Sequence, residues 1–121
     1  MRLYALRGAT SVDHNDAEEI LERTTELMEA VMNRNDLEAD DLVSCIFTVT
    51  DDLDAEFPAK AARAIGLGRV PLLCAREIPV PGSLPGIIRV LIHYHAPDGH
   101  VPDHTYLHGA KALRSDLHAA Q

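Results

Sequence analysis

The segment Ile87–His95 (IIRVLIHYH) constrains the fold most, because the extended chain that it predicts is apolar on both faces. One face carries four large apolar side chains: Ile88, Val90, Ile92 and Tyr94. The other face is apolar apart from Arg89 and two histidines. A strand of this kind belongs inside a sheet, and both of its faces should be covered.

Three other segments are short, apolar and rich in β-branched residues, as strands are: Arg2–Ala9, Leu42–Thr50 and Val70–Ala75. In the segments that connect these predicted strands, apolar residues recur at helical spacing instead. A long amphipathic helix is predicted from Asn15, with Glu18 completing a capping box, to about Arg34. A short helix is predicted to begin at Phe57-Pro58 and to stop near Gly66.

These elements predict one α+β domain over residues 1–121, with a mixed sheet of four or five strands. A Pro- and Gly-rich loop at 79–86 joins two of the strands, and Tyr106–Leu113 carries apolar residues without a clear period. One long helix and one short helix barely cover both faces of such a sheet. A bare apolar face usually meets another copy of the chain, so we expect an oligomer.

The 19 acidic and 11 basic residues are unevenly distributed. Residues 13–56 hold 15 of the acids and only two of the bases. A net acidic chain is a poor binder of nucleic acid. The sequence has neither a signal-peptide pattern nor an apolar run of membrane-spanning length, so we predict a cytoplasmic protein with Cys45 and Cys74 as free thiols.

The seven histidines invite a metal hypothesis, since five of them lie between His93 and His108. However, no Cys or carboxylate completes a recognisable ligand spacing, and neither cysteine has a CxxC partner. Cys74 lies in an apolar run, where a buried thiol is the usual case. We therefore expect no metal, no cofactor and no nucleophilic cysteine.

Three charged residues lie inside apolar strands or at their ends: Arg7, Glu77 and Arg89. Burying such groups is costly unless they have partners, so each is paired internally or meets a ligand. Both interpretations stay open on this argument alone. Two arginines against one glutamate leave excess positive charge, which favours a small anionic ligand.

Five segments in chain order resemble the small monofunctional chorismate mutases that form trimers with a pseudo-α/β-barrel fold. They are LRGATSV (6–12), FPAKAAR (57–63), Cys74-x-x-Glu77, Gly82-x-Leu84 through IRV (88–90), and Tyr106-Leu107-x-Gly109-Ala110 through LRSDL (113–117). The chain departs from the family pattern at Ser11, Leu73 and Ser115. None of these departures removes a charged residue that the chemistry needs.

The resemblance implies the Claisen rearrangement of chorismate to prephenate, a step in phenylalanine and tyrosine biosynthesis. By similarity, Arg89 stabilises the ether oxygen of the breaking bond and reaches a carboxylate of the substrate. Arg7 and Tyr106 bind the side-chain carboxylate. Glu77 accepts the ring hydroxyl and opposes the developing positive charge of the ring, and Cys74 packs nearby.

The resemblance further implies a homotrimer whose active sites lie between subunits. Phe57, Lys60 and Arg63 resemble the wall that a neighbouring subunit contributes, and Leu73 is a substrate-binding position. Two alternatives stay open: an imine-deaminase-like trimer, and a non-catalytic trimeric module that binds small carboxylates.

Overall fold

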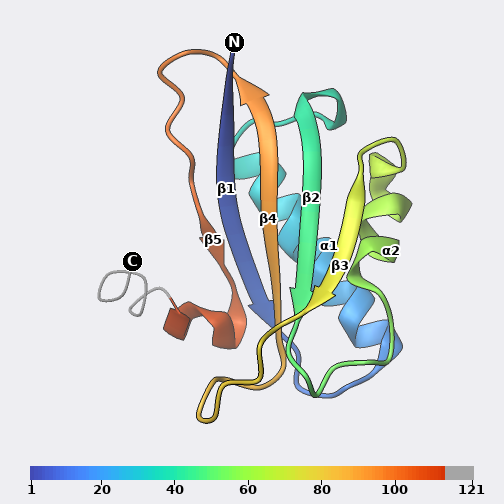
Figure 1. Ribbon diagram of the computed structural model, residues 1–121. Coiled ribbons are helices and arrows are strands. Elements are labelled where there is room, and N and C mark those ends of the chain that lie inside the picture. The colour runs from blue at the N-terminus through green and yellow to red at the C-terminus, as the bar shows by residue number, and fades with distance from the viewer. Residues whose placement is uncertain (114–121) are drawn as a thin grey trace.

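The computed structural model describes residues 1–113, which fold into a five-stranded sheet with two helices (Figure 1). The strands are β1 (Arg2–Ser11), β2 (Leu42–Val49), β3 (Leu72–Arg76), β4 (Ile87–Ala96) and β5 (Thr105–Tyr106). The helices are α1 (Ala17–Arg34) and α2 (Pro58–Ala62), with short helical turns η1 (Ala39–Asp41), η2 (Arg63–Leu67) and η3 (His108–Lys111). The predicted α+β class is confirmed.

The strand order is β3-β2-β4-β1-β5, so the strand with two apolar faces lies at the centre of the sheet. β4 runs antiparallel to both of its neighbours, whereas the outer pairs β2–β3 and β1–β5 are parallel. In Figure 1, α1 lies behind the sheet and α2 lies beside β3, and side chains of both helices belong to the same core on one face of the sheet. None of the helices in residues 1–113 has the length and apolar character that crossing a bilayer requires.

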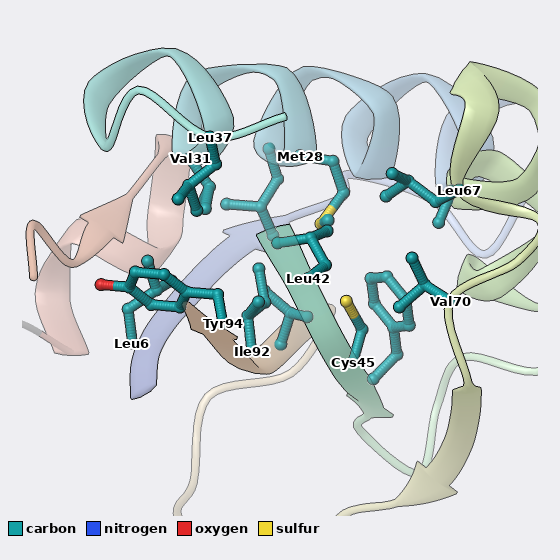
Figure 2. Packing of buried hydrophobic residues seen from close by; sticks show 14 of the residues in the cluster. Leu6, Met28, Val31, Leu37, Leu42, Cys45, Leu67, Val70, Ile92 and Tyr94 are labelled. Carbon is teal, nitrogen blue, oxygen red and sulfur yellow. The ribbon is translucent and has the colours of Figure 1, made fainter. Parts of the chain in front are cut away.

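The main hydrophobic core fills the space between the sheet and α1 (Figure 2). Side chains from β1, β2 and β4 meet the apolar stripe of the helix, including the fully buried Leu27, Met28 and Val31. Cys45 belongs to this core, and burial raises the pKa of its thiol to about 12. Cys45 is fully buried and contributes to core packing.

The N-cap of helix α1 lies one residue later than predicted. Asp16, not Asn15, is the N-cap, and its side chain accepts a hydrogen bond from the Glu19 backbone N–H at 3.0 Å. The side chain of Asn15 instead binds the turn after β2, where its Oδ1 accepts from the backbone N–H groups of Asp54 and Ala55. Both residue types suit an N-cap, so the sequence pattern does not separate them.

Gly8 allows α1 to lie close to β1. A Cβ at this position would be 3.3 Å from side-chain atoms of Leu27, Val31 and Val90, which is tighter than ordinary contact. Gly8 therefore allows close helix–sheet packing. Because successive side chains of a strand point to opposite faces, α1 lies on the face opposite to the Arg7 side chain.

In the described part of the chain, the other face of the sheet is open except at one corner, where η3 packs over Ala9 and Ile87. Leu73 on β3 and Leu3 on β1 leave 59% and 56% of their surface exposed. The central strand presents a half-buried Leu91 and an exposed Arg89 to this face. Within residues 1–113, two helices on one side thus leave the opposite apolar surface of β4 uncovered.

Candidate active site

A row of residues crosses all five strands on the open face. Register pairs Tyr106 with Ala9, Ala9 with Arg89, Arg89 with Thr48, and Thr48 with Ala75. Directly paired residues lie side by side on one face of a sheet. Pairing therefore brings Arg89 and Tyr106 onto the same face although they are remote in the sequence.

The neighbouring rows add the other predicted groups. Arg7 pairs with Leu91, in the same row as Leu73, and lies two residues from the Arg89 row. Glu77 follows the end of β3 and lies beyond the Arg89 row, on the side away from Arg7. Its backbone N–H donates to the Val49 carbonyl at 2.9 Å. Arg7, Glu77, Arg89, Tyr106 and Leu73 thus share one face of the sheet.

Glu77 and Arg89 meet in a pocket of about 540 Å³. Its other walls are the turn after β2 (residues 50–52) and the Pro-rich loop between β3 and β4. Glu77 Oε2 lies 3.6 Å from Arg89 Nε, and their side chains are 27% and 47% exposed. Within residues 1–113, neither terminal nitrogen of the Arg89 guanidinium makes a hydrogen bond, so both can bind a ligand.

Thr48, on strand β2, also contacts the Glu77 carboxylate. Its hydroxyl donates a hydrogen bond to Glu77 Oε2, the oxygen that also faces Arg89. Sequence reasoning missed this residue, because Leu42–Thr50 was interpreted as a buried apolar strand. The signal was present in the alternation of Ser44, Thr48 and Thr50 along one face of that strand.

Asp52 forms hydrogen bonds to the C-terminal end of the Pro-rich loop. Its carboxylate accepts from the Gly86 N–H at 3.0 Å, and the neighbouring Thr50 hydroxyl accepts from the Ile87 N–H at 3.0 Å. Gly86 has a φ of 66°, and a Cβ there would lie 2.8 Å from the Val12 carbonyl oxygen, so only glycine fits. Partial burial favours a higher pKa for Asp52, but hydrogen bonds from Thr50 and Gly86 outweigh it and lower the pKa.

We expect the substitution Asp52→Asn to destabilise the fold in a pH-dependent way. Since the folded-state pKa is lowered, the stabilisation is complete above the ordinary Asp value of 3.8 and is lost as the pH falls through the lowered pKa. The difference in unfolding midpoint between the wild type and Asp52→Asn should shrink between about pH 7 and pH 3. The control is Asp40→Asn, whose side chain makes no hydrogen bond within residues 1–113. An unchanged difference at the two pH values would contradict the expectation.

Arg7 is half-buried, and its backbone makes a hydrogen bond to a histidine next to the edge strand β5. The Arg7 backbone N–H donates to His104 Nδ1 at 3.0 Å. His104 directly precedes β5, so this bond fixes Tyr106 beside β1. Because Nδ1 accepts here, the bond needs the ring tautomer with the proton on Nε2.

The remaining predicted residues lie in a second region, around α2. A separate hollow of about 320 Å³ is lined by Phe57 and Cys74 among others, and Phe57 is 66% exposed. Cys74 pairs with Phe47 and packs against the core, on the face opposite to Arg89. Lys60 Nζ lies 3.1 Å from Glu56 Oε2, and Arg63 is exposed. In the single chain these residues do not meet Glu77 and Arg89.

Several histidines of the described part have different partners. His93 binds Ser44, His100 binds Tyr94, and His108 lies 2.7 Å from Glu26. Residues 1–113 contain no group of three or more His, Cys, Asp or Glu side chains arranged to hold a metal ion. Ser115 and the end of the LRSDL motif lie outside the described residues.

Comparison with known proteins assigns the chain to a family. Residues 3–117 match the family described as chorismate mutase type I. This match covers nearly the whole chain, and the chain belongs to the chorismate mutase type I family.

Two relatives and one solved structure are similar over nearly their full lengths. Chorismate mutase AroH of Thermus thermophilus is 48% identical over 119 residues, covering 96% of this chain and 97% of that protein. Chorismate mutase AroH of Bacillus subtilis (strain 168) is 38% identical over 120 residues, covering 97% of this chain and 94% of that protein. The structure of chorismate mutase from Clostridium thermocellum has a TM-score of 0.88 and 50% identity, covering 91% of this chain and 99% of that chain.

Proposed function

We propose that this chain is an isomerase that converts chorismate to prephenate, with the Glu77–Arg89 pocket as the centre of the reaction. The observation that carries the proposal is the partly exposed pair of opposite charges in that pocket, with Arg89 Nε 3.6 Å from Glu77 Oε2. Family membership supplies the reaction, and the pocket supplies groups suited to it. Together, family membership and the charged pocket favour this reaction over a non-catalytic or imine-hydrolysing role.

The Claisen rearrangement is unimolecular and pericyclic, so it needs neither a nucleophile nor a proton transfer. As the C–O bond breaks, the ether oxygen gains partial negative charge and the ring gains partial positive charge. A fixed guanidinium near the oxygen and a fixed carboxylate near the ring stabilise this separation more than they stabilise the substrate. In this proposal Arg89 faces the oxygen, and Glu77 accepts the ring hydroxyl and faces the ring.

Arg7 and Tyr106 bind the side-chain carboxylate of the dicarboxylate substrate. Both share the open face with Arg89, and an arginine fork suits a carboxylate. Holding the two ends of the substrate selects the compact conformer in which the reacting carbons are close. That orientation removes part of the barrier before any bond changes.

The second wall of the site comes from a neighbouring subunit in a homotrimer. Two observations support this part of the proposal. The open face of the sheet exposes apolar side chains such as Leu73, and the region around Phe57, Lys60 and Arg63 is separate from the Arg89 pocket within one chain. Leu73, on the open face, then belongs to the lining between subunits, and Cys74 belongs to the hollow that Phe57 also lines. The cytoplasmic location stays a prediction from the sequence.

The proposal is tested by incubating the purified protein with chorismate. We expect the ultraviolet absorbance of chorismate to fall and prephenate to accumulate in equal molar amount. Heat-denatured protein is the control for the slow uncatalysed reaction. Failure of the native protein to exceed that control would refute the proposed function.

We expect kcat to be insensitive both to pH and to the replacement of H₂O by D₂O. Since no general acid or base takes part, kcat should show no appreciable solvent deuterium effect and no bell-shaped profile between about pH 6 and 9. Metal chelators should leave the rate unchanged. The check is kcat at saturating chorismate in H₂O, in D₂O and across the pH range. A clear bell in kcat would instead indicate a titrating participant such as Glu77 or Cys74.

A further inference from the structure

We propose that Thr48 is a positioning residue that orients the Glu77 carboxylate and keeps it from closing on Arg89. This inference rests on the proposed function, because it concerns the same pocket. Its support is a single juxtaposition: one carboxylate oxygen, Glu77 Oε2, is contacted both by the Thr48 hydroxyl and, at 3.6 Å, by Arg89 Nε.

The backbone places Thr48 where it can do this. It is paired directly with Arg89 on one side and with Ala75 on the other, and Glu77 follows two residues after Ala75. Ala75 has a small side chain, and the Glu77 carboxylate reaches back to the Thr48 hydroxyl. Thr48 is half-buried and β-branched, so its hydroxyl has few alternative orientations.

The contact matters because Glu77 and Arg89 can otherwise satisfy one another. A guanidinium and a carboxylate favour a bidentate pair, in which both oxygens and two nitrogens are occupied. In the described part of the chain only one oxygen of Glu77 is engaged, and Thr48 donates a hydrogen bond to that same oxygen. Within residues 1–113, Glu77 Oε1 accepts no hydrogen bond and the terminal nitrogens of Arg89 donate none.

This division of partners leaves both charges available to a ligand. Oε1 can accept a hydroxyl of the substrate, while the Arg89 terminal nitrogens can bind its ether oxygen and carboxylate. Thr48 thus preorganises the pocket without touching the substrate. Its removal should affect the transition state, in which both charges are needed, more than it affects substrate binding.

The test compares Thr48→Val, which has nearly the same shape but no hydroxyl, with Thr48→Ser, which retains the hydroxyl. A hydrogen bond to a charged group is worth about tenfold or more in an equilibrium, so we expect Thr48→Val to lower kcat about tenfold while KM changes less than about twofold. Thr48→Ser should recover most of kcat. The matched control is Ser44→Ala on the same strand face, whose hydroxyl is bonded to His93 and not to Glu77. Wild-type kcat in Thr48→Val would overturn the inference.

A double-mutant cycle separates positioning from a general structural role. In the Glu77→Ala background there is no carboxylate to hold, so Thr48→Val should lower kcat by less than about twofold further. An equal loss in both backgrounds would show that Thr48 acts independently of Glu77. Thermal unfolding of each variant establishes that the compared proteins are folded.

A structural readout keeps the inference testable apart from activity. If the wild-type chain fails to turn over chorismate, the proposed function fails, and crystal structures of the wild type and Thr48→Val still decide the role of Thr48. We expect the Glu77 carboxylate to rotate onto Arg89 as a bidentate pair in the variant. An unmoved carboxylate would refute the inference.

Discussion

Replacing Arg89 by lysine should abolish most of the activity while the protein stays folded. Lysine keeps the positive charge, but it has no planar fork that reaches the ether oxygen and a carboxylate together. Arg89→Ala should lose about a hundredfold or more in kcat, as expected when a charge-stabilising donor is removed from a site. Because the Arg89 side chain is 47% exposed, the fold does not depend on its burial.

The measurement is kcat and KM for chorismate with the thermal unfolding midpoint of each variant. Arg34→Lys, in the last turn of α1, is the control for a simple Arg-to-Lys exchange away from the open face. Near-normal kcat in either Arg89 variant would remove this residue from the central role. A large fall in unfolding midpoint would show that the loss reflects folding.

Mixing two inactive variants should restore activity if the site is shared between subunits. Arg89→Ala damages the open-face half of each site, and Arg63→Ala damages the half around α2. In a cyclic trimer assembled at random from equal amounts, an interface combines the two intact halves with a probability of about a quarter. Activity after unfolding and refolding the two variants together should therefore rise to about a quarter of the wild type.

The two variants refolded separately are the controls, and their summed activity should be far lower. Size measurements on the mixture establish that subunits assemble and exchange. Trimers that exchange subunits without any rescue would rule out the shared site, and Arg63 would then be an ordinary exposed arginine near α2.

The regular elements could be predicted because their periods are long enough to be distinctive. Ile87–His95 alternates over a full strand, and α1 repeats its apolar stripe over several turns. β5 could not be predicted, since a strand of two residues has no period, and it exists only through pairing with β1. The prediction of the N-cap was wrong by one residue, because Asn15 and Asp16 are both suitable caps and the choice depends on contacts with Asp54 and Ala55.

The charged members of the site could be picked out because burying charge is costly, which singles out Arg7, Glu77 and Arg89 in the sequence. The role of Thr48 could not be identified, since threonine is also a common strand residue and its partner is set by cross-strand pairing. Phe57, Lys60 and Arg63 were proposed only from the family resemblance. Their relation to Arg89 depends on contacts between chains, which no pattern within one chain reveals.

The position of β4 has a consequence for how the pocket moves. Arg89 lies on a strand that is bonded on both sides along most of its length, so its backbone is in the part of the fold that opens least often. Tyr106 lies on a two-residue edge strand, whereas Glu77 is bonded both to Thr48 and to the Val49 backbone. Local opening at the β5 edge can therefore release Tyr106, while the guanidinium at the centre keeps its place. The fold thus combines a charged centre on a fully paired strand with an edge strand that has few backbone bonds.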